Sequence, residues 1–324
     1  MNPVKISLSR GLLFAALALS CTLATAQNKK VVLSQLFQSI QLLPVYVALD
    51  GGFFEKQGLD VSKQTAGSAN GALSALLSGS ADFSLHGPEW SAIAAEKGAP
   101  VQVVASVVSR PSFWIATSPD VKFNTIADLR GQTVVTGLMP TTSTSVFFKL
   151  LKENGLTPGK DLTVTQVAIG SEPGPLMAGQ AKVAVLYQPG LDQVAAKGMK
   201  VVYSFSKLYS AYTVAAISTR KNIDPELARR FVQGLQNAMI YMQKDEAGTI
   251  AIAKKEFPTL DPVVVEAAVK RMLSEQVYST SVDITQPAFK AAMQTQIDLG
   301  NLKTMPVYET LITRDYIKAA VASK

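Results

Sequence analysis

The stretch from Pro44 to Val61 most constrains the fold of this chain, because it lies between two short β-like runs at residues 31–36 and 60–63. Its apolar residues recur roughly at helical spacing, Pro44 suits the first turn of a helix, and Gly51-Gly52 breaks or kinks the pattern. A helix that joins two parallel strands is the βαβ unit of α/β proteins. The pattern predicts such a unit and leaves its function open.

Length and composition fit a globular protein of two domains. The chain has 324 residues, of which 48% are hydrophobic and 17% are charged, and one domain commonly takes about 150 residues. The formal net charge is +7, but the basic residues are scattered along the chain. A solvated surface explains such a distribution, so we expect no nucleic-acid partner.

The first 26 residues predict an export signal. Lys5 and Arg10 form a positive start, residues 11–20 are apolar but too few to span a bilayer, and Ala24-Thr25-Ala26 fits a signal-peptidase site. Cleavage there starts the mature chain at Gln27 and, through the loss of Lys5 and Arg10, lowers the net charge from +7 to +5. We therefore expect a periplasmic protein.

Cys21 is the only cysteine, and it leaves a second processing route open. The run Ala18-Leu19-Ser20-Cys21 loosely fits a lipoprotein site, so a lipid anchor on Cys21 is the alternative. Cleavage after Ala26 leaves no thiol for a disulfide, a nucleophile or a metal. Any zinc site or histidine triad would depend on His86, the only histidine, so we expect no metal site.

The loops that follow the predicted strands are candidate binding segments, because ligands of open parallel sheets gather outside the carboxyl ends of the strands. Gln38 and Ser39 follow the first run, and capping of the next helix is an equal alternative for them. Ser68 and Asn70 lie in a small-residue turn before a predicted helix at 72–78. The free N–H groups of that helix suit an anion or a carbonyl oxygen.

The next predicted strand, at 82–85, is followed by His86, Glu89 and Trp90. We predict that all three contact a ligand, since large aromatic side chains and a few polar groups line small-molecule pockets. Glu89 would repel a bare oxyanion but would accept hydrogen bonds from an amine or an aminopyrimidine. The alternatives are that His86 only stabilises a turn and that Trp90 is a core residue of a helix at 91–97.

Two extended runs predict that the chain crosses twice between two lobes. Residues 101–108 form a β-branched run typical of a strand buried on both faces, and Arg110 follows it as a candidate ligand residue. Residues 209–219 form the second crossing and include Tyr212, another candidate. The boundaries that follow are 27–112 with 220–324 for lobe 1 and 113–219 for lobe 2. A ligand would lie in the cleft between the two lobes, and the lobes would close on it by a hinge motion.

Lobe 2 repeats the arrangement of strands and strand-end loops. A predicted strand around 133–136 leads into a loop rich in hydroxyl groups, with Thr141, Thr142 and Ser143 as candidate ligand residues before a helix at 145–154. Tyr187 follows a short strand and is expected to line the cleft. Five further helices are expected to pack on lobe 1 without chemistry, at residues 224–241, 247–256, 263–274, 286–299 and 308–321.

Four segments carry a resemblance to a known family: GFFEKQGLDV at 52–61, the run 71–83 ending in SGSADF, DLRGQTV at 128–134, and LMAGQAKVAVLYQP at 176–189. They resemble the solute-binding proteins of ABC importers for nitrate, sulfonates, taurine and thiamine-pyrimidine precursors. The resemblance implies the two-lobed α/β fold of type II periplasmic-binding proteins, each lobe a mostly parallel sheet flanked by helices. It also implies a small-molecule solute, a partner permease in the inner membrane and a monomer, with no cofactor and no catalytic residue. Lys182 and Gln188 depart from the family pattern, where acids are usual, and the change at Gln188 weakens the case for a cationic ligand.

The sequence is compatible with more than one class of solute. Aromatic residues near the cleft suit a flat ring, whereas Arg110 and the hydroxyl loops suit a sulfonate, nitrate or carboxylate. The aromatic residues are Trp90, Phe113, Trp114, Tyr187 and Tyr212. Enzymes of the same fold, a pyrimidine synthase or a desulfinase, are the alternative, which the absence of cysteine from the mature chain disfavours.

Overall fold

The computed structural model describes residues 27–209 and 211–322. The predicted export signal and the lipid-anchor alternative at Cys21 lie outside these residues. None of the helices within them has the length and apolar character that crossing a membrane requires.

The first sheet has the strand order β2-β1-β3-β10-β4. Strand β1 pairs in parallel with β2 and β3, whereas β10 runs antiparallel to both β3 and β4. One strand in five therefore runs against the others, and it is the one that returns from the second half of the molecule. The bounds are Lys29–Gln35 for β1, Leu59–Thr65 for β2, Phe83–His86 for β3, Val101–Val108 for β4 and Ala215–Arg220 for β10.

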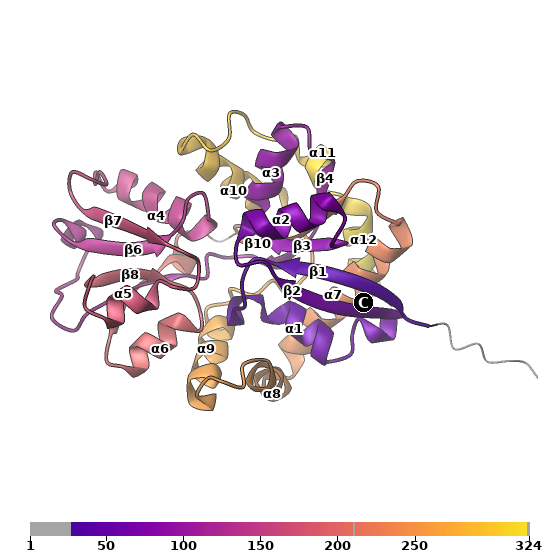
Figure 1. Ribbon diagram of the computed structural model, residues 1–324, viewed down its shortest axis with the longest axis horizontal. Helices are drawn as coiled ribbons and strands as arrows, with labels where there is room; N and C mark the ends of the chain where they lie inside the picture. Colours follow the sequence, from indigo (N-terminus) through magenta and orange to yellow (C-terminus); the bar gives the residue numbers. More distant parts are fainter. Residues whose placement is uncertain (1–26, 210, 323–324) are drawn as a thin grey trace, which may run out of the picture.

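Helices cover both faces of this sheet, with α2 and α3 on one face and α1 and α7 on the other (Figure 1). The bounds are Leu43–Asp50 for α1, Ala69–Ser78 for α2, Pro88–Glu96 for α3, Pro225–Lys244 for α7 and Glu246–Glu256 for α8. The predicted βαβ unit is confirmed, because α1 joins the parallel strands β1 and β2.

Helix α1 ends just before Gly51-Gly52, where the pattern predicted a break or a kink. It ends at Asp50, and the chain then turns through Gly51 and Gly52 before a short 3-10 helix, η2, at Glu55–Gln57. A Cβ atom at Gly51 would lie 2.6 Å from the carbonyl oxygen of Val47, so the chain folds this tightly only with glycine there.

The second sheet has the strand order β7-β6-β8-β5-β9 and is built in the same way. Strand β6 pairs in parallel with β7 and β8, and β5 runs antiparallel to β8 and β9. The strands are β5 (Trp114–Thr117), β6 (Thr133–Gly137), β7 (Thr163–Val167), β8 (Val183–Leu186) and β9 (Lys200–Ser204). Helix α4 (Thr142–Glu153) lies on one face, and α5 (Pro173–Met177) and α6 (Gly190–Ala196) lie on the other (Figure 1).

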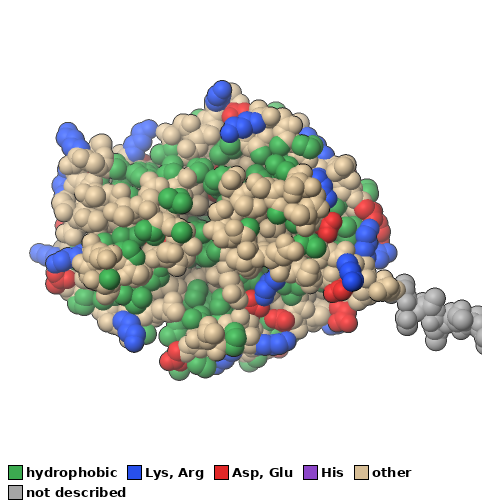
Figure 2. Space-filling view, in the orientation of Figure 1, with side chains coloured by type: hydrophobic (Ala, Val, Ile, Leu, Met, Phe, Trp, Pro, Cys, Tyr) green, Lys and Arg blue, Asp and Glu red, His purple; other side chains and the backbone are tan. Residues whose placement is uncertain are grey.

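The predicted two-lobed α/β fold is confirmed. The chain passes from β4 to β5 and returns from β9 to β10. The two passing segments are hydrogen-bonded to each other, from the N–H of Tyr212 to the carbonyl of Ser109 and from the N–H of Val214 to that of Val108, both at 2.9 Å. On the face that Figure 2 shows, charged side chains lie scattered toward the edge of the molecule, and the junction between the lobes carries mainly uncharged groups.

The C-terminal helices differ from the prediction in two ways. The single helix expected at 308–321 is two helices, α11 (Tyr308–Leu311) and α12 (Arg314–Ala322), because Ile312 is extended and the N–H of Thr313 donates to the carbonyl of Val103 at 3.0 Å. Helices α9 (Pro262–Ser274) and α10 (Gln286–Asp298) also contact the second lobe. Arg271 of α9 forms an ion pair with Asp192 at 2.8 Å, and Lys149 pairs with Asp298 at 2.9 Å.

Candidate functional site

A small cavity lies where the two lobes meet, and we call it the cleft cavity. Its lining comes from the first lobe, from the second lobe and from the returning chain before and at the start of β10. It has a volume of about 20 Å³, which is room for about one water molecule, so the structure represents a closed form. The lining residues are Leu36, Gln41, Ala69, Gly87, Glu89, Trp90, Thr141, Thr142, Ile169, Tyr187, Val214 and Ala215.

Three helix N-termini meet at the cleft cavity. Ala69 is the first residue of α2, Glu89 is the second of α3 and Thr142 is the first of α4. Unpaired N–H groups and the helix dipoles make such termini partly positive. The cavity therefore favours acceptor groups, although no Lys or Arg is among its lining residues.

Glu89 joins the two lobes across the cavity. Its side chain is only 2% exposed, and its carboxylate accepts a hydrogen bond from the hydroxyl of Thr142 at 2.8 Å. Burial raises the pKa of Glu89 from its ordinary value of 4.5 to about 7, against the opposing effect of its hydrogen bonds. A Cβ atom at Gly87 would lie 2.2 Å from the Glu89 carboxylate, so the glycine makes room for this acid.

Trp90 and Tyr187 supply aromatic walls from opposite lobes. The indole Nε1 of Trp90 is buried and has no hydrogen-bond partner, which is unusual for a buried donor. Tyr187 packs edge-on against Phe37 and Phe113, with ring centroids 5.5 and 5.9 Å apart. Burial raises the pKa of the Tyr187 hydroxyl, which therefore stays protonated.

The hydroxyl-rich loop of lobe 2 lies at the same place. Thr141 and Thr142 line the cavity, and the hydroxyl of Thr141 donates to the carbonyl of Leu138 at 2.7 Å. Ser143 is fully buried next to Thr142 but does not line the cavity. These residues begin α4, so the predicted helix starts three residues earlier than expected.

Sequence reasoning missed Gln41 and Glu172. Gln41 lines the cavity and lies two residues beyond the predicted pair Gln38 and Ser39. Glu172 is 1% exposed, accepts a hydrogen bond from the N–H of Gly170 at 2.7 Å and leaves its Oε1 atom without a partner. Burial raises its pKa to about 7. It lies in the loop after β7. Ligands gather at the carboxyl ends of parallel strands, so this loop is also a candidate binding segment.

Gln38, Ser39, Ser68 and Asn70 were also predicted, and they do not line the cavity. Gln38 is exposed and donates to Glu256 Oε1 at 2.8 Å. Ser39 caps the 3-10 helix η1 (Ile40–Leu42), as the alternative proposed, and its hydroxyl also donates to the carbonyl of Gln188 in the other lobe. Ser68 caps α2, and Asn70 is exposed in its first turn.

His86, Arg110 and Tyr212 do not line the cleft cavity either, and their contact with a solute stays a prediction. His86 is fully buried, and its two ring nitrogens lie 2.8 Å from the carbonyl of Gly87 and 3.0 Å from the hydroxyl of Ser84. Burial lowers its pKa to about 4, so it is a neutral core histidine. Tyr212 is fully buried against Tyr209, and Arg110 faces a different cavity.

Comparison with known proteins identifies the family. Residues 39–247 match the model of the family described as "NMT1/THI5 like". The Bacillus subtilis (strain 168) protein named "Putative binding protein YtlA" is 24% identical over 327 residues, which cover 97% of this chain and 96% of that protein.

Solved structures share the fold at low identity. The alkanesulfonate-binding protein SsuA of Xanthomonas axonopodis pv. citri, bound to MOPS, is 16% identical with a TM-score of 0.70 over 90% of this chain and 97% of its own. A zinc-bound ligand-binding component of an ABC-type import system from Staphylococcus aureus is 13% identical with a TM-score of 0.75, over 90% and 99%. The desulfurization enzyme DszB, as a mutant in complex with biphenyl-2-sulfinic acid, is 10% identical with a TM-score of 0.68, over 92% and 100%. Within residues 27–209 and 211–322 of this chain, no cluster of His, Cys, Asp and Glu has a composition that could hold a metal ion.

Proposed function

The chain belongs to the NMT1/THI5-like family, and from this membership we propose that it is the solute-binding component of an ABC importer. It would capture a small solute between its lobes, outside the inner membrane, and deliver it to a permease as a monomer. The segments that resemble importer-binding proteins and the named function of the Staphylococcus aureus protein support this proposal.

The observation that carries the proposal is the buried, incompletely paired polar surface between the lobes. The buried Nε1 atom of Trp90, which lines the cleft cavity, has no partner, and an unpaired buried polar group costs about 1–3 kcal/mol. A solute that accepts a hydrogen bond from it would remove this cost. Because the closed cavity holds about one water molecule, the lobes must open around the two crossing segments to admit a solute.

The lining favours a flat, nitrogen-containing solute. Glu89 offers an acceptor, Trp90 a donor and Tyr187 a ring face, and no side chain with a permanent positive charge lines the cavity. An amine would donate to Glu89, and an amino-heterocycle would also accept from the indole of Trp90 through a ring nitrogen. A bare oxyanion would instead meet the carboxyl of Glu89.

A sulfonate or carboxylate is the second candidate, since three helix N-termini favour acceptors and the pKa of Glu89 near 7 allows its carboxyl to be protonated. The two classes differ in their response to pH. An amine or amino-heterocycle would bind more tightly as the pH rises through 7, and an oxyanion would bind more tightly as it falls.

Binding without turnover distinguishes this proposal from the enzymes of the same fold. Cys21 is the only cysteine and lies in the predicted signal, so a thiol-dependent desulfinase mechanism has no nucleophile in the mature chain.

A thermal-shift screen of the mature protein tests the proposal. Sulfonates, nitrate, aromatic acids, amines and aminopyrimidines would each be tested at pH 6 and pH 8, because a solute at a hundredfold its Kd adds about 2.7 kcal/mol of stability. One class should raise the melting temperature, and mass spectrometry should recover it unchanged. A recovered product of different mass would replace the binding proposal with an enzymatic one, and no shift with any class would remove its support.

A further inference from the structure

A second and much larger cavity adjoins the segments that join the lobes, and we call it the hinge cavity. Its volume is about 880 Å³, within the range of small-molecule pockets. Ser109 and Arg110 of one crossing segment and Ala211 and Thr213 of the other form one side of it. Thr213 lines the hinge cavity and its neighbour Val214 lines the cleft cavity, so the returning segment separates the two cavities.

One wall of the hinge cavity is apolar and adaptable. Met239 and Met242 come from α7, Met272 and Leu273 from α9, and Tyr278 from the loop that follows. Methionine side chains adjust to irregular apolar ligands and contact aromatic rings favourably. This wall therefore suits an apolar body such as an alkyl chain or a ring system.

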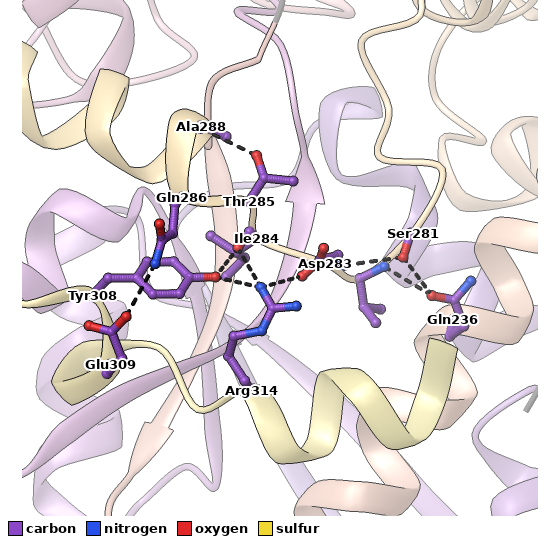
Figure 3. Close-up of polar contacts among 11 residues, drawn as sticks. Gln236, Ser281, Asp283, Ile284, Thr285, Gln286, Ala288, Tyr308, Glu309 and Arg314 are labelled. Carbon is purple, nitrogen blue, oxygen red and sulfur yellow. Dashed lines mark hydrogen bonds and ion pairs between the residues drawn. The ribbon is translucent and has the colours of Figure 1, made fainter. Parts of the chain in front are cut away.

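The loop at 281–285 is held in place by the polar contacts that Figure 3 shows. Gln236 accepts hydrogen bonds from the hydroxyl of Ser281 at 3.2 Å and from the N–H of Val282 at 3.0 Å. Arg314 forms an ion pair with Asp283 at 3.1 Å and donates to the hydroxyl of Tyr308 at 2.7 Å. These contacts fix the loop, so this side of the cavity is preformed.

Arg110 is the charged group that remains available to a ligand. It is half-buried, and within the described residues its guanidinium has neither a hydrogen bond nor an ion pair. The other charged lining residues differ, because Asp283 forms an ion pair with Arg314, although its buried Oδ1 atom accepts no hydrogen bond, and Glu246 is exposed to solvent. A guanidinium with five donors and no partner matches the geometry of a carboxylate or sulfonate.

We propose that the hinge cavity binds an organic anion with an apolar body, whose carboxylate or sulfonate pairs with Arg110 while the body packs on the methionine wall. This site is separate from the cleft cavity and does not depend on which solute binds there. Its occupant would contact both crossing segments.

A matched pair of dyes tests the proposal. 8-Anilinonaphthalene-1-sulfonate has an apolar ring system with a sulfonate, and N-phenyl-1-naphthylamine has the same rings without it. Titrations followed by dye fluorescence should show one saturable site for the sulfonate. Arg110→Gln should weaken sulfonate binding about tenfold or more and change the affinity of the uncharged dye less than twofold.

Two control variants locate the dye. Lys244→Gln removes the same charge from an exposed position of α7 that does not line the cavity, and it should leave both affinities unchanged. Trp90→Ala alters the cleft cavity only and should also leave sulfonate binding unchanged. Unchanged sulfonate affinity in Arg110→Gln, loss of it in Trp90→Ala or Lys244→Gln, or no saturable binding to the unsubstituted protein would each overturn the proposal. A melting temperature for each variant confirms that it is folded.

Discussion

Replacing Glu89 by Gln should change how the stability of the protein depends on pH. The carboxyl of Glu89 has a pKa near 7 in the folded protein, against 4.5 ordinarily, so between these values the folded protein holds a proton that the unfolded chain has released. The contribution of Glu89 to the free energy of unfolding therefore falls as the pH rises from about 4.5 to about 7, and is constant above. A pKa difference of one unit corresponds to about 1.36 kcal/mol, so the free energy of unfolding falls by roughly 3 kcal/mol over this range.

Glutamine is the suitable replacement because its amide has the same shape and no proton to lose. Its Oε1 atom can still accept the hydrogen bond that Thr142 donates to Glu89. The free energy of unfolding of Glu89→Gln minus that of the unsubstituted protein should then increase by roughly 3 kcal/mol between pH 4.5 and pH 7.5.

Only the difference in free energy of unfolding between the variant and the unsubstituted protein isolates the contribution of Glu89. Glu172 has a pKa raised in the same direction and weakens the protein over the same pH range. His86 acts in the opposite direction, because its pKa is lowered from 6.5 to about 4 and the stability it contributes is lost as the pH falls from about 6.5 to 4. The three effects overlap in the curve of the unsubstituted protein, and subtraction removes the two that the variant retains.

The assay is urea unfolding at half-unit steps from pH 4.5 to pH 8, followed by both tryptophan fluorescence and circular dichroism. Coincident transitions are needed before free energies are compared. Glu96→Gln, at an exposed position of the same helix, is the matched control and should run parallel to the unsubstituted protein. If the free energies of unfolding of Glu89→Gln and of the unsubstituted protein run parallel across this pH range, the reasoning is refuted. Water would then reach this carboxyl in the folded protein.

Three further predictions concern single positions. Trp90→Ala and Tyr187→Ala should each lower solute affinity about tenfold or more, measured by calorimetry, because each loses about 1–3 kcal/mol of stacking and burial; normal affinity with a large drop in melting temperature would make Trp90 a core residue. Gly87→Ala should destabilise the protein by about 1–3 kcal/mol in urea unfolding, since its Cβ would meet the Glu89 carboxylate at 2.2 Å, and unchanged stability would show that this carboxylate is free to move. Mass spectrometry of the exported protein should find Gln27 at its N-terminus, whereas an acylated N-terminal cysteine would indicate lipoprotein processing.

The sequence was sufficient to locate the cleft but not to orient every side chain in it. Strand ends and small-residue turns predicted the loops, and Glu89, Trp90 and Tyr187 line the cavity as expected. Their roles in binding a solute remain predictions. His86 lies only three residues from Glu89, yet its ring nitrogens are held by Ser84 and Gly87. Such a difference depends on side-chain direction, which spacing along the chain does not determine.

Contacts between segments that lie far apart in the chain could not be predicted from the sequence either. Periodicity predicted helices near α9 and α10, but it did not indicate that Arg271 meets Asp192 or that Lys149 meets Asp298. The break at Ile312 likewise follows from pairing of the next residue, Thr313, with Val103 of β4. Local patterns carry no information about such partners.

The cost of closing an empty cleft explains how a solute would favour the closed form. The ion pair between the lobes at Lys149 is partly exposed, and pairs of this kind are worth about 0–1 kcal/mol. The closed form without solute also buries the carboxyl of Glu89 and leaves Trp90 Nε1 unpaired. A solute that accepts from Trp90 would recover about 1–3 kcal/mol. That gain exists only in the closed form, so the solute would shift the population of the protein toward it.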